Sequence, residues 1–336
     1  MKNNNEIILS VKDLKTYIYV NNRCNRAVDG VSFDVHKGKT LGIVGESGCG
    51  KSITASSIMQ LLPKLSRIES GEIIYYKENK AIRIDKLERN GKSMRDLRGA
   101  DISMIFQDPM TALNPVYSIG SQIKENLIYH TSMDKISMNE KTIEMLKIMG
   151  IPLPHQRAEE YPHQFSGGMR QRAMIAMAMA CNPKILIADE PTTALDVTIQ
   201  AQIFELMLNL KKEHQTAIIL ITHDMGVIAE LADEVAVMYM GNIVEKGSVS
   251  EVLRKPAHPY TKALLESIPI LGKGKKQKIE PIRGSTPDPY QRPEGCQFLP
   301  RCNYSSEKCV ENPSYHHITK TQFVRCWKSE EVLSYV

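Results

Sequence analysis

The sequence predicts an α/β fold built around a parallel β-sheet. The first observation is a short apolar run, residues 40–44, followed by a glycine-rich turn and by a helix-forming stretch, residues 52–62, that a proline closes. This order is typical of a buried strand, a loop and a helix. The second observation is a strand, helix and strand pattern over residues 184–188, 197–214 and 217–222, which predicts a βαβ unit.

The other segments are expected to attach to this sheet. Residues 7–35 carry β-branched and aromatic residues in partial alternation, which predicts an antiparallel ribbon. Residues 94–165 are rich in helix formers and loop breakers, and we expect an inserted helical subdomain there. Residues 234–246 predict a hairpin that turns at Gly241 and Asn242. Beyond Gly247 prolines recur at short intervals, so the rest of the chain is expected to be an irregular, turn-rich appendage.

Composition narrows the class of protein. The 336 residues are 42% apolar and 24% charged, which is ordinary for a globular protein. Apolar runs such as residues 173–180 fall far short of the ~18–20 residues that cross a bilayer, and residues 1–10 lack the apolar core of a secretory signal. We therefore expect a cytosolic chain with reduced cysteines. The net charge of +5 comes without a basic stretch interleaved with aromatics, so no nucleic-acid partner is expected.

The glycine-rich turn matches the P-loop pattern and lies between the predicted strand and helix, as that pattern requires. Backbone N–H groups of such a loop surround phosphate oxygens, and the positive end of the helix points at them. Lys51 is expected to reach the β- and γ-phosphates of ATP, and the Ser52 hydroxyl to bind Mg²⁺. A glycine turn that matches by chance is the alternative. The predicted nucleotide-binding residues are Gly45, Glu46, Ser47, Gly48, Cys49, Gly50, Lys51 and Ser52.

Two adjacent carboxylates end the predicted strand over residues 184–188. Phosphoryl transfer needs a metal ligand and a group that orients the attacking water. We expect Asp189 to bind Mg²⁺ through water and Glu190 to polarise the attacking water. Without the P-loop upstream, such a pair would more often begin a solvated loop.

Residues 165–171 read Phe-Ser-Gly-Gly-Met-Arg-Gln and resemble the signature motif of ABC-type ATPases. Ser166 suits the N-cap of a helix over residues 169–180, and Gly167 and Gly168 permit the close approach of an anion. In the family this site closes over the γ-phosphate bound by a partner subunit. An ordinary capped helix is the alternative.

The resemblance extends over about residues 7–247 and implies further site residues. Gln107 resembles the Q-loop glutamine that senses Mg²⁺ and the attacking water, and His223 resembles the switch histidine that contacts the γ-phosphate. Thr193-Ala194-Leu195-Asp196 resembles the D-loop, in which Asp196 counts as a nucleotide-site residue. The family stacks adenine on an aromatic residue near the first strand. Ile18 aligns with that position, and the neighbouring Tyr19 is proposed as the stacking residue, with packing in the strand as the alternative.

The C-terminal part resembles that of oligopeptide and dipeptide importer ATPases, a subfamily that includes some nickel importers. The resemblance rests on His-Pro-Tyr-Thr-Lys-Ala-Leu-Leu at 258–265, on Gly-Cys-Gln-Phe-Leu-Pro-Arg-Cys at 295–302 and on the string at 107–115. Four cysteines crowd into this part, and their spacing lacks the short first gap of a compact zinc site. Four thiolates suit an iron–sulfur cluster. The resemblance implies a [4Fe–4S] cluster, with zinc or free thiols as alternatives, at Cys296, Cys302, Cys309 and Cys326.

The resemblance therefore implies a P-loop NTPase of ABC type with an antiparallel β ribbon, a helical subdomain (about 94–180) and a small cysteine-rich C-terminal module. The ATPase domain is expected over residues 1–250 and the module over 251–336. The implied function is ATP hydrolysis that powers the import of short peptides, with nickel import as the nearest alternative. Implied partners are a second homologous ATPase, two membrane permeases and an external peptide-binding protein, at the cytoplasmic face of the cell membrane. An ABC-type ATPase acting on nucleic acid or the ribosome, and a regulatory module without turnover, are alternatives from other classes.

Overall fold

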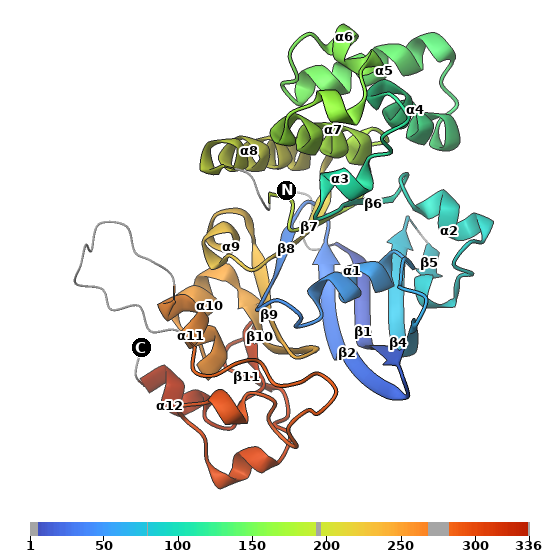
Figure 1. Ribbon diagram of the computed structural model, residues 1–336. Coiled ribbons are helices and arrows are strands. Elements are labelled where there is room, and N and C mark those ends of the chain that lie inside the picture. Colours follow the sequence, from blue (N-terminus) through green and yellow to red (C-terminus); the bar gives the residue numbers. More distant parts are fainter. Residues whose placement is uncertain (1–5, 79, 193–195, 268–281, 335–336) are drawn as a thin grey trace. The chain divides into compact units, whose positions relative to one another are not determined.

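A computed structural model describes residues 6–78, 80–192, 196–267 and 282–334 (Figure 1). The chain divides into two compact units. The first comprises Met1–Ile7, Val35–Lys39 and Lys86–Ile221, and the second comprises Ile8–Asp34, Thr40–Asp85 and Thr222–Val336. Among the described residues, no helix is long and apolar enough to cross a membrane.

The first unit combines parallel strands with a group of helices. Strand β7 pairs in parallel with β6 on one side and with β8 on the other. The parallel pairing of β7 and β8, joined by α8, confirms the predicted βαβ unit. The elements of this unit are α2 (Lys92–Leu97), β6 (Ile102–Ile105), α3 (Pro109–Ala112), α4 (Ile119–His130), α5 (Lys135–Ile148), α6 (Pro154–Glu159), η2 (Pro162–Gln164), α7 (Gly167–Met179), β7 (Ile185–Asp189), α8 (Val197–His214) and β8 (Ala217–Thr222).

The segment predicted to be helical contains a strand. Helices α4 to α7 pack together, as the green part of Figure 1 shows. All four residues of β6, however, are buried and pair with β7. The prediction was wrong over these residues because four residues, one of them Ser103, are too few to give a distinct period.

The second unit contains a four-stranded sheet in the order β2-β1-β4-β5 and the strands β3, β9, β10, β12 and β11. Strand β1 pairs antiparallel with β4, so the predicted ribbon is present and is wider than expected. Its elements are β1 (Ile7–Val20), β2 (Arg23–His36), β3 (Thr40–Val44), α1 (Lys51–Ile58), β4 (Ser66–Lys77), β5 (Lys80–Arg83), η1 (Ile84–Lys86), α9 (Met225–Leu231), β9 (Glu234–Tyr239), β10 (Asn242–Ser248), α10 (Val249–Arg254), α11 (Pro259–Glu266), η4 (Leu299–Arg301), η5 (Glu307–Val310), β11 (His316–His317), β12 (Phe323–Val324) and α12 (Ser329–Ser334).

Burial explains why the central strands form where they do. Every residue of β3, β7 and β8 is buried, as expected for apolar strands of a parallel sheet covered on both faces. Helix α1 follows β3 but ends at Ile58, earlier than the predicted limit at residue 62, because Gln60 adopts a left-handed conformation with φ 52°. Strands β9 and β10 form the predicted hairpin.

The C-terminal segment, residues 249–267 and 282–334, is anchored to β10. Strand β12 extends the sheet by pairing antiparallel with β10. The fully buried Glu245 carboxylate accepts backbone N–H bonds from Ala257 at 2.8 Å and His258 at 3.0 Å, and a bond from the Gln322 amide at 2.8 Å. Burial raises the pKa of Glu245, and these donors offset part of the cost of burying it.

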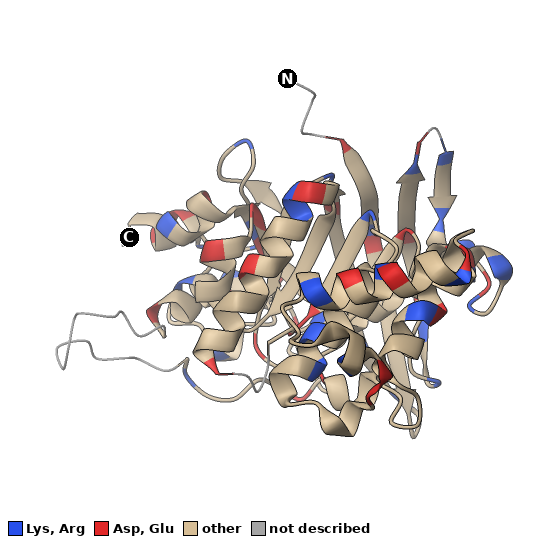
Figure 2. Cartoon of the chain, turned by 90° about the horizontal axis from the view of Figure 1, so that it is seen from above, with Lys and Arg blue, Asp and Glu red and all other residues tan. Residues whose placement is uncertain are grey.

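Figure 2 shows acidic and basic residues interspersed along the same helices.

Candidate functional site

The glycine-rich loop has the backbone conformation of a phosphate-binding turn. Residue Gly50 is the N-cap of α1 and has φ 107°, a left-handed conformation that favours glycine. A Cβ atom at this position would overlap the carbonyl oxygen of Ala27. The loop can therefore pass from the buried strand β3 into α1 only with glycine at this point.

Lys51 lies inside the loop. Its Nζ donates to the carbonyl oxygens of Gly45 at 2.7 Å and of Glu46 at 3.1 Å. The side chain is buried, whereas Ser52 is exposed. The ammonium group is thus held by backbone oxygens at the loop, where the oxygens of a bound phosphate could replace them. Burial raises the pKa of the Cys49 thiol beside it, so Cys49 is a neutral packing residue rather than a reactive one.

In the first unit, a glutamine and a glutamate predicted to be catalytic are in contact. The Gln107 side-chain amide donates to a Glu190 carboxylate oxygen at 2.9 Å. Glu190 has φ 46°, which is rare for a residue with a side chain and concentrates at functional sites. Asp189, which precedes it, is buried at the end of β7. The hydroxyl, amide and carboxylate oxygens of Ser52, Gln107 and Asp189 are the kind of donors that Mg²⁺ prefers.

The predicted signature residues begin α7. The Ser166 hydroxyl caps the helix by accepting the N–H of Met169 at 3.3 Å. Among the described residues, and apart from its chain neighbours and its own helix backbone, no heavy atom lies within 4 Å of a Cβ built on Gly167. A Cβ on Gly168 would lie 3.2 Å from Cγ2 of Ile199. Gly168 therefore has a packing role within the chain, and Gly167 borders open space that an external group could occupy.

The other predicted residues end strands or begin helices. Asp196 caps α8 by accepting the Ile199 N–H at 2.9 Å, and residues 193–195 of the predicted D-loop lie outside the described part of the chain. His223 is exposed directly after β8. The P-loop and His223 belong to the second unit, and the other predicted catalytic and signature residues belong to the first.

The predicted adenine-stacking residue packs against its own sheet. The Arg67 guanidinium lies over the ring of Tyr19 at 4.7 Å, and the Tyr19 hydroxyl donates to Glu69 at 2.5 Å. Along β1, Tyr19 points to the face opposite Thr16, because side chains alternate. The Thr16 hydroxyl meets that of Ser57 on α1 at 2.9 Å, so Tyr19 faces away from α1.

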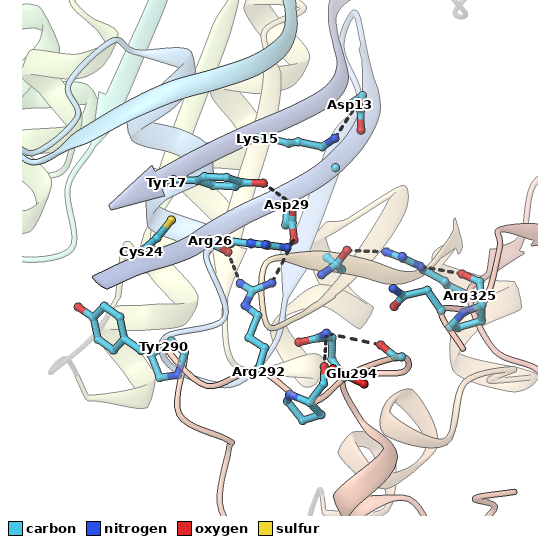
Figure 3. Close-up of a pocket in the computed structure, with 18 of the residues that line it drawn as sticks. Asp13, Lys15, Tyr17, Cys24, Arg26, Asp29, Tyr290, Arg292, Glu294 and Arg325 are labelled. Atoms are coloured by element: carbon cyan, nitrogen blue, oxygen red, sulfur yellow. Dashed lines mark hydrogen bonds and ion pairs between the residues drawn. The ribbon is translucent and has the colours of Figure 1, made fainter. Parts of the chain in front are cut away.

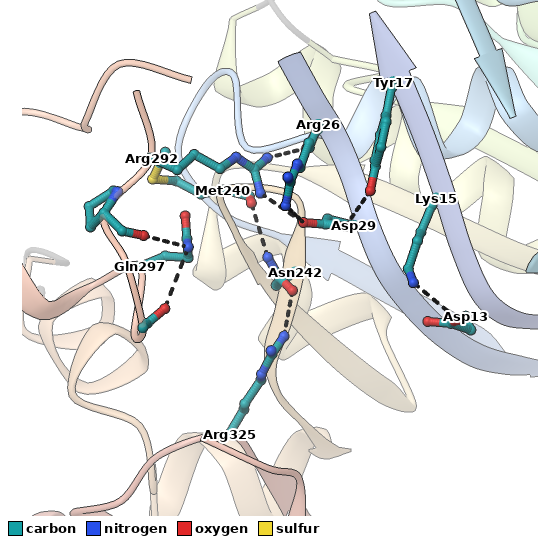
Figure 4. Close-up of polar contacts among 12 residues, drawn as sticks. Asp13, Lys15, Tyr17, Arg26, Asp29, Met240, Asn242, Arg292, Gln297 and Arg325 are labelled. Atoms are coloured by element: carbon teal, nitrogen blue, oxygen red, sulfur yellow. Dashed lines mark hydrogen bonds and ion pairs between the residues drawn. The ribbon is translucent and has the colours of Figure 1, made fainter. Parts of the chain in front are cut away.

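The face of β1 that carries Tyr17 and Tyr19 borders a cavity of about 1140 Å³. Its other side is the C-terminal segment, with Tyr290 and Arg292 among the lining residues (Figure 3). Asp29 accepts the Tyr17 hydroxyl at 2.9 Å and a bond from Arg292 at 3.4 Å, so this carboxylate links the ribbon to the C-terminal segment (Figure 4). Most charged groups of the cavity are thus paired with one another.

The four C-terminal cysteines gather around one small cavity, of about 10 Å³. The sulfur of Cys302 accepts the N–H of Tyr304, and that of Cys326 accepts the N–H of Lys328, both at 3.3 Å. Burial raises the pKa of Cys302 to about 11 and of Cys326 to about 12. The thiol donors suit a soft metal. Among the described residues, however, no group of three or more His, Cys, Asp or Glu is arranged to hold one, so the iron–sulfur prediction receives no support from the geometry.

The sequence analysis missed two residues that contact the P-loop from the C-terminal segment, Tyr260 and Arg301. Both contact Glu46, the second residue of the loop. Arg301 lies in the string at 295–302, between the predicted metal ligands Cys296 and Cys302. An arginine amid apolar and cysteine residues was the available signal, because arginine is seldom buried without a partner.

The P-loop after a buried strand, the paired Gln107 and Glu190, and the capped signature helix define an ATP-binding cassette ATPase. Residues 28–193 match the ABC transporter family, and residues 244–309 match the C-terminal region of oligopeptide/dipeptide transporters. The chain belongs to the family of ATP-binding proteins of oligopeptide and dipeptide ABC transporters.

Similar proteins support this assignment over nearly the whole chain. The dipeptide transport ATP-binding protein DppD of Haemophilus influenzae is 48% identical over 95% of this chain and 94% of its own length. The oligopeptide transport ATP-binding protein AppD of Bacillus subtilis is 48% identical over 96% and 97%. The ATP-binding cassette MJ0796, in a dimeric post-hydrolysis state bound to ADP and Pi, is 25% identical with a TM-score of 0.64, over 72% of this chain and 99% of that one.

Proposed function

We propose that this chain hydrolyses MgATP to power the import of short peptides through a multi-subunit membrane transporter. The observation that carries the proposal is the extent of the similarity, since relatives named for dipeptide and oligopeptide transport match 95% and 96% of the chain. The match includes the C-terminal region, residues 244–309, which lies outside the ABC match at residues 28–193.

Each predicted site residue has a separate role in the proposed hydrolysis of ATP. The P-loop binds the phosphates through backbone N–H groups and Lys51. Ser52, Asp189 and Gln107 would hold Mg²⁺, which would supply positive charge to the phosphate oxygens. Glu190 orients the attacking water, and its hydrogen bond from Gln107 limits the positions that its carboxylate can take. His223 contacts the γ-phosphate.

We propose that a second homologous ATPase completes each site. Ser166 and Gly167 would cover the γ-phosphate bound to the partner, and Asp196 would lie at the same interface. Support comes from the open space at Gly167 and from the N-terminus of α7 beneath it, which favours an anion. ATP would favour the closed pair because its γ-phosphate contacts both subunits, and hydrolysis would release it.

Two permease subunits and an external peptide-binding protein are the remaining proposed partners. The helical part of the first unit exposes several large apolar side chains that could dock a cytoplasmic segment of a permease. These side chains are Met110, Val116, Tyr117, Ile128, Tyr129, Met133, Ile136 and Leu153. Such docking would hold the chain at the cytoplasmic face of the cell membrane.

The cysteines are proposed to hold a [4Fe–4S] cluster, with zinc as the second choice. The proposal rests on the kind and number of donors, four thiols that line one cavity, and not on their arrangement. The cluster would act as a structural staple, because ATP hydrolysis includes no redox step. Visible absorbance and iron content of the anaerobically purified chain, lost in Cys302→Ser, would support the cluster; a colourless chain with stoichiometric zinc would contradict it.

The experiment that tests the assembly is an affinity purification of the tagged chain from gently solubilised membranes. We expect two permeases and a second ATPase to co-purify. Replacement of Ile136 and Tyr129 by Asp should reduce the recovery of the permeases without loss of ATP binding. Recovery of ribosomes or nucleic acid instead of permeases would contradict the proposal.

A further inference from the structure

Glu46 places a carboxylate in the loop that must bind a polyphosphate. It is the second residue of the P-loop, and its side chain is 28% exposed. A carboxylate beside bound phosphates disfavours binding through like-charge repulsion, unless a cation neutralises it. The residue that supplies this cation therefore influences how strongly the loop can bind phosphate.

Arg301 of the C-terminal segment supplies the cation. Its two terminal nitrogens donate to the two Glu46 carboxylate oxygens at 2.6 and 3.0 Å, a bidentate pair. Its Nε donates to the carbonyl oxygen of Arg283 at 2.8 Å. The Arg301 side chain is only 4% exposed, so water screens this pair weakly.

Aromatic rings fix Arg301 in place. The rings of Tyr239 and Phe298 each lie 5.9 Å from its guanidinium carbon, and the two rings pack edge to face at 5.3 Å. Tyr260 packs against both, and its hydroxyl accepts the backbone N–H of Glu46 at 2.8 Å. The C-terminal segment therefore holds Glu46 by its side chain and by its backbone.

Glu46 is also connected to the phosphate-binding lysine. Its carbonyl oxygen accepts a bond from Lys51 Nζ at 3.1 Å, so one residue lies between the guanidinium of Arg301 and the ammonium of Lys51. Removal of Arg301 would leave the Glu46 carboxylate without its cation. A bond of 3.4 Å from the Thr286 hydroxyl would remain, and the carboxylate could turn toward Lys51. That carboxylate would then compete with phosphate for the lysine.

We propose that Arg301 is a positioning residue for nucleotide binding, which acts by neutralising Glu46 and keeping its carboxylate away from the phosphate site. This inference rests on the proposed placement of the ATP phosphates at residues 45–52. It gives the C-terminal segment a direct part in nucleotide affinity. Because Cys302 follows Arg301, the turn that holds the P-loop also carries one of the four cysteines.

The test is the Kd of a fluorescent ATP analogue for the full chain, measured in wild type, Arg301→Ala, Glu46→Gln and the double variant. We expect Arg301→Ala to raise the Kd by about tenfold or more, as when a hydrogen-bonded charge loses its partner. Arg301→Ala should raise the Kd far less in the Glu46→Gln background than in wild type. The double variant should return to within about threefold of wild type, because no uncompensated carboxylate remains.

A matched control is Arg325→Ala. Arg325 is another arginine of the C-terminal segment, bonded to Asn242 and to the Pro313 carbonyl, with no contact to residues 45–52 among its described contacts. Its ATP affinity should equal that of wild type. Thermal unfolding of each variant reports folding separately. If Arg301→Ala does not fold, Arg301→Gln, which removes the charge but keeps an amide donor, takes its place and should also raise the Kd.

Two results would overturn the proposal. They are an unchanged Kd in folded Arg301→Ala and a double variant as weak as Arg301→Ala. Lys51→Ala distinguishes a failure of the proposed phosphate site from a failure of the role proposed for Arg301. If Lys51→Ala binds ATP as well as wild type, the proposed phosphate site itself is wrong; if it loses affinity and Arg301→Ala does not, only the role of Arg301 is wrong.

Discussion

The side-chain amide of Gln107 donates a hydrogen bond of 2.9 Å to the carboxylate of Glu190, a residue with φ 46°. This bond fixes the direction of one Glu190 carboxylate oxygen. The backbone N–H of Glu190 is fixed in turn by the carbonyl oxygen of Ile221 at 2.9 Å. The carboxylate is therefore oriented from its side chain and from its backbone.

Replacement of Glu190 should separate ATP binding from hydrolysis. In Glu190→Gln we expect the rate of hydrolysis to fall by about 10²- to 10⁴-fold, the usual contribution of a positioned general base. The Kd for ATP should stay near that of wild type, because the water-orienting group does not hold the phosphates. Phosphate release measured alongside ATP binding checks both, with Glu205→Gln on α8 as a control. Turnover unchanged in Glu190→Gln would rule out the assigned role.

Replacement of Gln107 should have a smaller effect of the same kind. Gln107→Ala removes the donor that orients Glu190 but leaves the carboxylate, so we expect roughly a tenfold loss of kcat, within the cost of a misplaced catalytic group. Gln107→Glu places a second negative charge beside Glu190 and should lose more activity. Steady-state hydrolysis tests this, and equal rates for the two variants would contradict it.

The sequence could predict the P-loop because all of its determinants are local. A buried run, glycines at fixed spacing and a helix follow one another within residues 40–58. The contacts of Gln107 with Glu190 and of Arg301 with Glu46 join residues 83 and 255 positions apart, and no local period reports such pairs. Strand β4 was missed because glycine and charged residues interrupt its alternation. Alternation along β1 places Tyr19 on the face opposite Thr16. Only the position of α1, which contacts Thr16, shows that Tyr19 faces away from that helix.

Replacement of Gly167 should affect ATP hydrolysis alone, whereas replacement of Gly168 should also affect stability. Gly167→Ala adds a Cβ with no neighbour within 4 Å, so we expect an unchanged unfolding temperature. If the γ-phosphate of a partner approaches there, hydrolysis should fall by about tenfold or more. Gly168→Ala brings a Cβ to 3.2 Å from Ile199 and should lower the unfolding temperature as well. Full ATPase activity of Gly167→Ala in the assembled transporter would count against the composite site.

Glu251 should make the contact between α10 and residues 319–321 sensitive to acid. Hydrogen bonds, first from Ser248 and then from Thr319 and Thr321, lower its pKa from 4.5 to about 2. The folded state therefore binds this proton less readily than the unfolded state. The resulting stabilisation is fully present above pH 4.5 and is lost as the pH falls toward 2.

The corresponding variant is Glu251→Gln. At pH 7 we expect it to cost about 1 kcal/mol of unfolding free energy through weaker hydrogen bonds. Its stability should then decline less steeply than that of wild type below pH 4.5. Urea unfolding at a series of pH values measures this, with Glu266→Gln as a control at an exposed position. Parallel stability curves for Glu251→Gln and wild type would refute the assignment.

The most direct test of the central claim is the uptake of a radiolabelled dipeptide by cells in which this chain is replaced by Glu190→Gln, with nickel uptake measured in the same cells. The account predicts that wild type supports dipeptide uptake, that Glu190→Gln abolishes it although the transporter still assembles, and that nickel uptake is unaffected. Dipeptide uptake that persists in Glu190→Gln cells while nickel uptake is lost would contradict it.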